Sequence, residues 1–179
     1  GQVPVGRWDA ARLDAVGVLR AARHGGFVHG AELHDNGRFN VSPAEAAAMD
    51  PQQRLVLERG YEALHAARHE RSTLGGSLSG VFLGIAANEF GQLLAVMPAG
   101  ASVYAATGSS HSIACGRLSY VLGVHGPCVS YDTACSAALV ACHAAVRSLQ
   151  LAECVAGLSA GMNLMLAPAT GASFAVAGM

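Results

Sequence analysis

The chain has 179 residues, of which 52% are hydrophobic, 13% charged and 6% aromatic, and its formal net charge is −1. This length fits one domain, and the low charge with high apolar content excludes a disordered chain. Near neutrality gives no electrostatic basis for binding nucleic acid or an anionic membrane. All eleven basic residues are arginines, which excludes chemistry that needs a lysine amine, such as a Schiff base.

Charge is distributed unevenly along the chain. From Gly91 to Met179 the formally charged side chains are only Arg117, Asp132, Arg147 and Glu153. We expect this half to be mostly buried, inside a larger body or against a partner protein, because an exposed surface needs more polar groups. The uncharged stretch from Cys154 onward is interrupted by Asn163 and Pro168, so it does not predict a membrane span.

The five cysteines are odd in number, form no C-x-x-C pair and lie in the apolar half: Cys115, Cys128, Cys135, Cys142 and Cys154. This pattern predicts free thiols in a reducing intracellular compartment, such as the cytoplasm or a plastid, rather than a disulfide framework. No targeting signal is recognisable in these residues. No histidine is paired with a cysteine at the short spacing of a zinc site, so no metal site is predicted.

Residues 1–79 are predicted to form loops and capped helices. The segment from Gly1 to Val41 is irregular and mixes Gly, His and charged residues. Ser42 to Glu45 forms a capping box with Pro at the first helical position, and Asp50-Pro51 repeats the device. Two successive helices are therefore expected, the second ending before Gly75.

Residues 80–179 alternate between strand and helix patterns. Short apolar runs predict strands at Gly80–Ile85, Cys128–Tyr131 and Cys154–Ala160, and helices are predicted at Ser109–Leu122 and Ser136–Leu151. The order β, α, β, α, β predicts an α/β fold with a parallel sheet and helices packed on it.

Cys135 lies where the second strand ends and the next helix begins, the usual place for functional groups in a parallel sheet. Unpaired backbone N–H groups and the helix dipole stabilise a thiolate there. The same N–H groups can hydrogen-bond the oxyanion that forms when the sulfur is acylated. Cys135 is therefore a candidate nucleophile for acyl transfer. The alternative is that it is a small buried hydrophobic residue.

The other cysteines have less support as functional groups. Cys115 and Cys128 fall inside a predicted helix and strand, and we interpret both as core residues. Cys142 follows Cys135 by two helical turns, too far for a disulfide or a shared metal ion.

The remaining polar residues of the apolar half have no recognisable catalytic context. The histidines His111, His125 and His143 are interpreted as surface or structural side chains. Asp132 is expected to have a structural role, either orienting the turn before Cys135 or pairing with Arg117.

Several motifs match one family. The segment Asp132–Ala141 (DTACSAALVA) resembles the active-site segment of β-ketoacyl synthase domains, in particular those of modular, type I polyketide synthases. Met49–Arg54 (MDPQQR) is similar to the same family's helix signature. Supporting segments follow in the family's order over almost the whole chain: Gly80–Gly84, Ala106–Gly108, Gly116–Tyr120, Gly126–Pro127 and Gly161–Pro168.

The resemblance implies a thiolase-like α/β fold, of which residues 1–179 would be the first half only, a partial ketosynthase domain. It implies an acyltransferase of the 3-oxoacyl-[acyl-carrier-protein] synthase or polyketide synthase type. Cys135 would be the catalytic residue, taking an acyl chain from the phosphopantetheine arm of an acyl carrier protein. A malonyl-type extender would then lose CO₂ and attack the thioester in a decarboxylative Claisen condensation.

The resemblance also implies the partners of the protein. The domain would bind no cofactor or metal itself, because its substrates arrive on the carrier's phosphopantetheine arm. Expected partners are an acyl carrier protein, a second copy in a homodimer and other domains of a multidomain synthase. Family members dimerise with the strand before the nucleophile near the twofold axis, and neither nucleic acid binding nor a membrane span is expected.

The chain also departs from the family. Two catalytic histidines lie downstream of the cysteine in the family, and neither their motifs nor the usual opening strand occurs here, so we expect an internal fragment that cannot complete condensation alone. Alternatives are a discrete fatty-acid condensing enzyme or a thiolase, although Met49–Arg54 favours the multidomain type. An alternative of another class is a non-catalytic module for dimerisation or carrier docking.

Overall fold

The computed structural model describes residues 2–4, 7, 8 and 24–177. The chain divides into two compact units. One is Ala31–Asn163, and the other combines Gly1–Gly30 with Leu164–Met179.

A parallel sheet of three strands lies at the centre of the larger unit. The strands are β1 (Ser79–Ile85), β2 (Cys128–Tyr131) and β3 (Ala156–Met162). Their spatial order is β2-β1-β3, and β1 pairs in parallel with both neighbours, which confirms the predicted parallel sheet. The third strand begins at Ala156 rather than at Cys154, which is a buried residue in the preceding turn.

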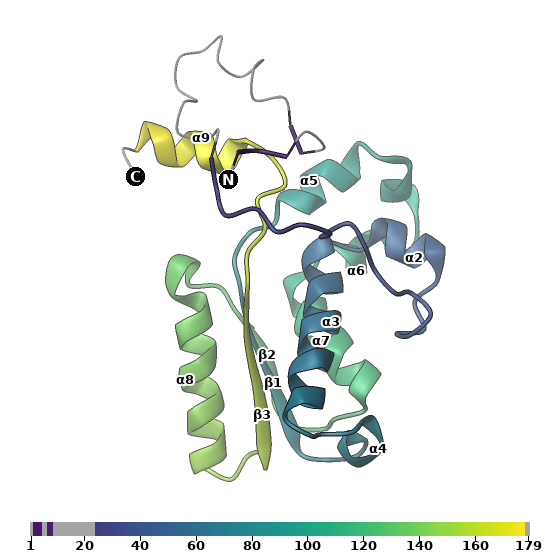
Figure 1. Cartoon of the computed structure of the whole chain (residues 1–179), viewed down its shortest axis with the longest axis vertical. Helices are drawn as coiled ribbons and strands as arrows, with labels where there is room; N and C mark the ends of the chain where they lie inside the picture. Colours follow the sequence, from purple (N-terminus) through teal and green to yellow (C-terminus); the bar gives the residue numbers. More distant parts are fainter. Residues whose placement is uncertain (1, 5–6, 9–23, 178–179) are drawn as a thin grey trace. The chain divides into compact units, whose positions relative to one another are not determined.

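Helices cover both faces of this sheet (Figure 1). The helix α8 (Ala137–Gln150) packs on one face, and α3 (Pro51–Ala66) and α7 (His111–Leu122) pack on the other. All seven residues of β1 are buried, as expected for a central strand between two helical layers. The core beneath α3 and α7 includes Met49, Leu57, Leu83, Ile85 and Leu118, and the core beneath α8 includes Phe82, Ala141, Ala145 and Cys154.

Shorter elements complete the unit: α2 (Pro43–Ala48), α4 (Arg71–Leu74), α5 (Glu89–Ala95), the 3-10 turns η3 (Pro98–Ala101) and η4 (Ala134–Ser136), and α6 (Ala105–Gly108). Both predicted helix starts are confirmed. The Ser42 hydroxyl accepts a hydrogen bond from the Glu45 N–H at 3.1 Å, and the Asp50 carboxylate accepts one from the Gln52 N–H at 2.7 Å.

The second helix ends before Gly75, as expected. The helix α3 stops at Ala66. Arg68 adopts a left-handed backbone conformation, with φ of 62°, which breaks the helix without a glycine. The residues after it form the separate short helix α4.

A buried polar cluster joins α3 to the loop before α7. Gln53 is 1% exposed, and its amide nitrogen donates to the Thr107 and Ser110 carbonyls at 3.0 and 3.1 Å. Its amide oxygen accepts a hydrogen bond from Arg117 Nε at 3.1 Å. Arg117 also pairs with Glu45, so it is not the partner of Asp132. These bonds satisfy both ends of one buried amide, which fixes its orientation.

The smaller unit contains the helix α9 (Ala169–Val176). Arg7 Nη1 donates to the Met165 carbonyl at 2.7 Å, and the Trp8 and Phe27 rings meet edge to face with centroids 5.7 Å apart. The described part of this segment agrees with the irregular start expected from the sequence, and residues 9–23 lie outside it. In neither unit does a described helix combine the length and apolar character that a membrane crossing requires.

The amide of Gln53 provides a test of this packing. Gln53→Glu keeps the shape but replaces two N–H donors with an oxygen that faces two carbonyls, so we expect a loss of about 1–3 kcal/mol in stability. Gln150→Glu makes the same chemical change at an exposed site of α8 and is expected to stay within about 0.5 kcal/mol. The measurement is thermal unfolding of the whole chain. Equal melting temperatures for the two variants would contradict the role of this cluster.

Candidate active site

The turn between β2 and α8 carries Cys135 and is held by its own polar side chains. The Asp132 carboxylate accepts a hydrogen bond from the Ala134 N–H at 3.2 Å. The Ser136 hydroxyl donates to the Thr133 carbonyl at 2.8 Å. Of the two roles expected for Asp132, the structure supports the first, in which Asp132 orients this turn.

Ala134, immediately before Cys135, has a left-handed backbone conformation with φ of 51°. A residue with a Cβ atom adopts this region at a cost of roughly 1–2 kcal/mol. Such conformations persist only where the surrounding structure determines them, and they cluster at functional sites. The turn therefore holds Cys135 in one particular orientation.

Cys135 is exposed at the start of α8, so it is not the buried core residue considered as the alternative. The residue that precedes α8 is Ser136, and its side chain makes no capping bond to the helix. Its hydroxyl bonds to the carbonyl and hydroxyl oxygens of Thr133 instead. Ser136 therefore does not cap α8, and the Ala137 N–H at the start of this helix donates to the Ala134 carbonyl instead.

The first turn of α8 lies very close to the sheet. A Cβ atom on Gly84 of β1 would lie 2.5 Å from the Ala138 nitrogen, and one on Gly161 of β3 would lie 2.5 Å from the Ala138 Cβ. Gly84 and Gly161 are direct partners in the sheet. Small residues on the inner face of α8, such as Ala137 and Ala141, permit the same close approach. These glycines therefore set the height of Cys135 above the sheet.

The loop that follows β1 ends near the same edge of the sheet and is held by two side chains. The Gln52 amide donates to the Ala87 carbonyl at 2.8 Å, and His111 Nε2 lies 3.1 Å from the same oxygen. The His111 carbonyl in turn accepts a hydrogen bond from the Ser130 hydroxyl of β2 at 2.7 Å. The MDPQQR segment and the start of α7 thus stabilise the loop after β1, at the same end of the sheet as the turn of Cys135.

Burial affects the charge of the residue that begins α3. Asp50 is 2% exposed, and desolvation raises the pKa of its carboxyl above the usual value despite hydrogen bonds from Gln52. Desolvation likewise lowers the pKa of Arg54, whose guanidinium donates to the Met49 carbonyl at 2.7 and 3.0 Å. Both side chains bond to the backbone near the helix start, which is a structural role.

None of the three histidines of the apolar half hydrogen-bonds to Cys135 in the described residues. The His111 ring bonds to the loop after β1, and the backbone N–H of His125 donates to the Ser77 carbonyl at the opposite end of the sheet. His143 is exposed on α8, two turns beyond Cys135. The described residues also contain no cluster of three or more His, Cys, Asp or Glu side chains suited to a metal ion.

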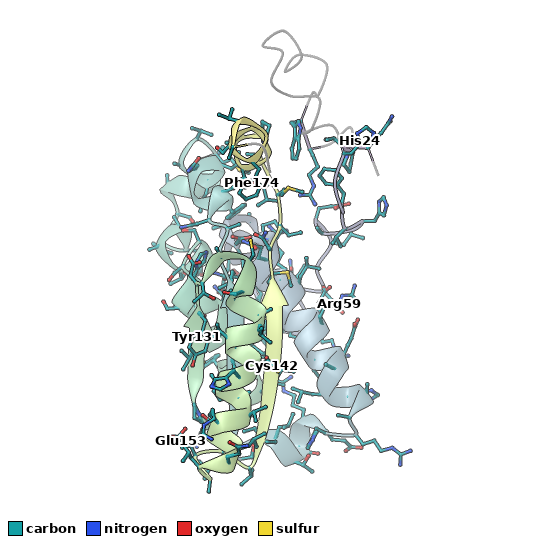
Figure 2. All side chains as sticks on the ribbon, turned by 90° about the vertical axis from the view of Figure 1, so that its left-hand side faces the viewer. His24, Arg59, Tyr131, Cys142, Glu153 and Phe174 are labelled. Atoms are coloured by element: carbon teal, nitrogen blue, oxygen red, sulfur yellow. The ribbon has the colours of Figure 1, made fainter. Side chains whose placement is uncertain are left out.

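The other cysteines differ in exposure. Cys115 is buried, as predicted, but Cys128 is exposed, so its interpretation as a core residue was wrong. The reason is that β2 is an edge strand, whose residues are covered less completely than those of β1. Cys142 is also exposed, on the helix α8 that faces the viewer in Figure 2.

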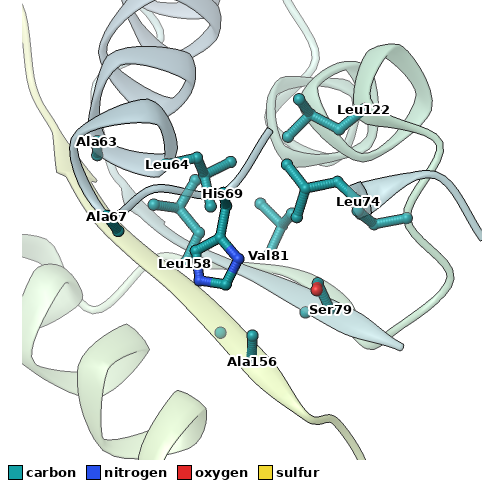
Figure 3. A pocket seen from close by; sticks show the side chains of 13 residues that line it. Ala63, Leu64, Ala67, His69, Leu74, Ser79, Val81, Leu122, Ala156 and Leu158 are labelled. Carbon is teal, nitrogen blue, oxygen red and sulfur yellow. The ribbon is translucent and has the colours of Figure 1, made fainter. Parts of the chain in front are cut away.

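An apolar pocket of about 140 Å³ lies at the other end of the sheet (Figure 3). Ser79 and Ala156 line it, and these residues begin β1 and β3. Leu64 and His69 approach from the end of α3 and the loop after it. Cys135 follows the carboxyl end of β2, so this pocket is not the space in front of the candidate nucleophile.

Comparison with known proteins defines the family. The model for the N-terminal domain of β-ketoacyl synthases matches residues 1–179. The chain therefore belongs to the β-ketoacyl synthase family and has its thiolase-like fold. Its relatives are, more narrowly, ketosynthase domains of polyketide synthases.

Two relatives of known sequence support this assignment. The chain is 44% identical over 172 residues to a phenolphthiocerol/phthiocerol polyketide synthase of Mycobacterium tuberculosis, covering 94% of this chain and 11% of the relative. It is 39% identical over 182 residues to a mycocerosic acid synthase-like polyketide synthase of Mycolicibacterium smegmatis, covering 99% and 9%.

Solved structures give the same family. The ketosynthase from module 6 of the Bacillus subtilis bacillaene synthase matches with a TM-score of 0.89 and 35% identity, over 100% of this chain and 29% of that one. An oxazolomycin ketosynthase domain of Streptomyces albus matches with a TM-score of 0.87 and 32% identity, over 100% and 32%. The chain thus spans about a third or less of each relative.

The two glycines provide a test of the site geometry. Gly84→Ala introduces a Cβ that meets the backbone of Ala137 and Ala138, so we expect the first turn of α8 to move and the alkylation rate of Cys135 to change at least severalfold. Gly157→Ala is the control on β3, because its nearest neighbour is the Phe82 ring at an ordinary 3.5 Å. Iodoacetamide labelling and peptide mass analysis give the rates. An unchanged rate of Cys135 labelling in Gly84→Ala would show that Gly84 does not determine the position of Cys135.

Proposed function

We propose that Cys135 is the acyl-accepting nucleophile of a polyketide-type ketosynthase. The observation that carries the proposal is an exposed thiol at the start of α8, set in a turn that contains the left-handed Ala134. Family membership supports the reaction class, and the segment around Cys135 is the one that resembles the family's active site.

The first half of the proposed reaction is a transthioesterification. The Cys135 thiolate attacks the carbonyl carbon of an acyl chain carried as a thioester on phosphopantetheine. The N–H groups at the start of α8 hydrogen-bond the oxyanion of the tetrahedral intermediate. The intermediate collapses, the pantetheine thiolate leaves and takes up a proton, and the acyl chain stays on Cys135. A thiolate suits both steps because it attacks well and leaves well.

The second half forms the carbon–carbon bond. A malonyl-type extender on an acyl carrier protein loses CO₂, and the resulting carbanion attacks the carbonyl carbon of the Cys135 thioester. The Cys135 thiolate departs and the chain is lengthened by the extender. The His111 ring is bonded within the fold, and the backbone bond of His125 places it at the opposite end of the sheet from Cys135, so we assign neither of them to decarboxylation.

We also propose that β2 lies at the interface of a homodimer. This strand is at one edge of the sheet, so its outer N–H and C=O groups are open to a further strand. Val129 of β2 is 37% exposed, and Tyr120 of the adjacent α7 is 87% exposed. A second copy that covers these residues would account for the scarcity of charge in this half of the chain.

Acyl loading of cysteine variants tests the proposed nucleophile. Incubation of the whole chain with an acyl thioester of N-acetylcysteamine is expected to add one acyl group to the peptide that contains Cys135. Cys135→Ala should lose this label completely, because no other thiol replaces the nucleophile. Cys142→Ala is the matched control, since it removes an exposed thiol from the helix that follows Cys135.

The readout is the mass of the labelled peptide together with circular dichroism of each variant. A Cys135→Ala protein that is folded and still acquires one acyl group would overturn the assignment. Equal acylation of Cys135 and Cys142 would favour the non-catalytic module, because exposure alone would then explain the labelling.

A further inference from the structure

A second pocket, of about 270 Å³, lies beside α3 and is not part of the proposed active site. Its lining comes from the loop before α2, from α3 and α7, and from the start of α4: Arg38, Phe39, Tyr61, Arg71, Val121 and Leu122. Among the described residues that line it, two are arginines and none is acidic. We call it the arginine pocket. Leu122 also lines the apolar pocket at the end of the sheet opposite Cys135, so the two pockets are neighbours.

The two guanidinium groups lack an anionic partner. Within the described residues, neither Arg38 nor Arg71 forms an ion pair. The Asp35 carboxylate accepts a hydrogen bond from the backbone N–H of Arg38 at 3.1 Å, and Glu70, which precedes Arg71, does not line the pocket. Two positive charges at one concave site, without a counter-charge, attract an anion.

The fold holds Arg38 in place before any ligand binds. Its guanidinium carbon lies over the Tyr61 ring, 4.4 Å from the ring centroid. The turn that carries Arg38 is closed by a hydrogen bond from the Val41 N–H to the Asn36 carbonyl at 3.0 Å. Phe39 is buried and meets the Tyr61 ring edge to face, with centroids 6.3 Å apart. An anion therefore has to restrict less side-chain motion when it binds.

The lining also indicates the chemical class of the anion. Each guanidinium can form two parallel N–H···O bonds to one oxyanion, so two of them match a group with several oxygens and more than one charge. A phosphate monoester meets this requirement, because its charge at neutral pH is close to two, whereas a carboxylate carries one. The apolar side chains of Val121 and Leu122 favour an apolar group attached to the phosphate.

We propose that the arginine pocket binds a phosphate monoester with an apolar substituent. The phosphate is held by Arg38 and Arg71, and the substituent contacts Val121 and Leu122. Because Arg38 precedes α2 and Arg71 begins α4, the bound ligand links the loop before α2 to α4 and stabilises the folded chain. Binding uses neither the Cys135 thiol nor an acyl group, so it is independent of the proposed reaction.

Titration of the whole chain with phenyl phosphate tests the proposal, with amide NMR spectra to locate the site and calorimetry to measure the affinity. We expect saturable shifts of the Arg38, Phe39 and Arg71 amide signals and a higher melting temperature with the ligand. Inorganic phosphate lacks the apolar group and benzoate has a single charge, so both should bind more weakly. Equal affinity for either of them would overturn the assignment to a phosphate monoester.

Substitutions of single arginines complete the test. Arg38→Gln and Arg71→Gln are each expected to weaken phenyl phosphate binding by about tenfold or more, because each removes one charge-assisted contact. Arg59→Gln is the matched control, since Arg59 is exposed on α3, pairs with Glu62 and does not line the pocket. It changes the net charge by the same amount and should leave the affinity unchanged.

Two results would contradict the proposal. Equal weakening in all three arginine variants would show general charge attraction instead of a site. Wild-type spectra in which the Arg38 and Arg71 signals do not shift would overturn it even if a variant fails to fold. Cys135→Ala is expected to bind phenyl phosphate as the wild type does, so a failure of acyl loading and a failure of this binding are separate outcomes.

Discussion

The position of the Cys135 sulfur, the proposed nucleophile, depends on how closely the helix α8 approaches the sheet. The first turn of α8 lies against Gly84 of β1 and Gly161 of β3, where any larger side chain would meet the helix backbone or Ala138. Helix and sheet layers usually keep the distance that their side chains dictate. At the paired glycines Gly84 and Gly161, the alanines of α8 come closer to the sheet than larger side chains would allow. Cys135, which lies in η4 just before the first turn of α8, is placed by this contact.

On the opposite face of the sheet, buried amide side chains hold the loops at the same end of the sheet as Cys135. Gln52 and Gln53 are almost fully buried at the start of α3, and their amide groups bond to backbone carbonyls of loops beside the sheet. A buried amide is costly unless its hydrogen bonds are made, so these loops are held in one arrangement. His111 adds a bond to Ala87, the same residue that Gln52 holds. The packing of α8 on one face of the sheet and the amide hydrogen bonds on the other face thus define the structure around Cys135.

Local patterns were sufficient to predict the strands, the capped helix starts and the junction that bears Cys135, because each depends on neighbouring residues. Features that depend on distant residues were not predictable. Arg117 pairs with a glutamate 72 residues earlier in the chain. The exposure of Cys128 follows from the order of strands in the sheet, and the close contact at Gly84 follows from its register. The sequence placed the end of α3 only before Gly75, and its position at Ala66 was not predictable because Arg68, which is not a glycine, takes the left-handed conformation.

The left-handed Ala134 has a consequence for the speed of the chemistry. Its unfavourable backbone geometry is established when the protein folds, before the thioester of the proposed reaction would bind. In the proposed reaction, the Cys135 sulfur would therefore not have to search for its position during each turnover. Reorganisation of the attacking group is a large part of the barrier for reactions in water, and a pre-organised turn removes much of it. A glycine would adopt this conformation more easily, but it would also let the turn relax into others.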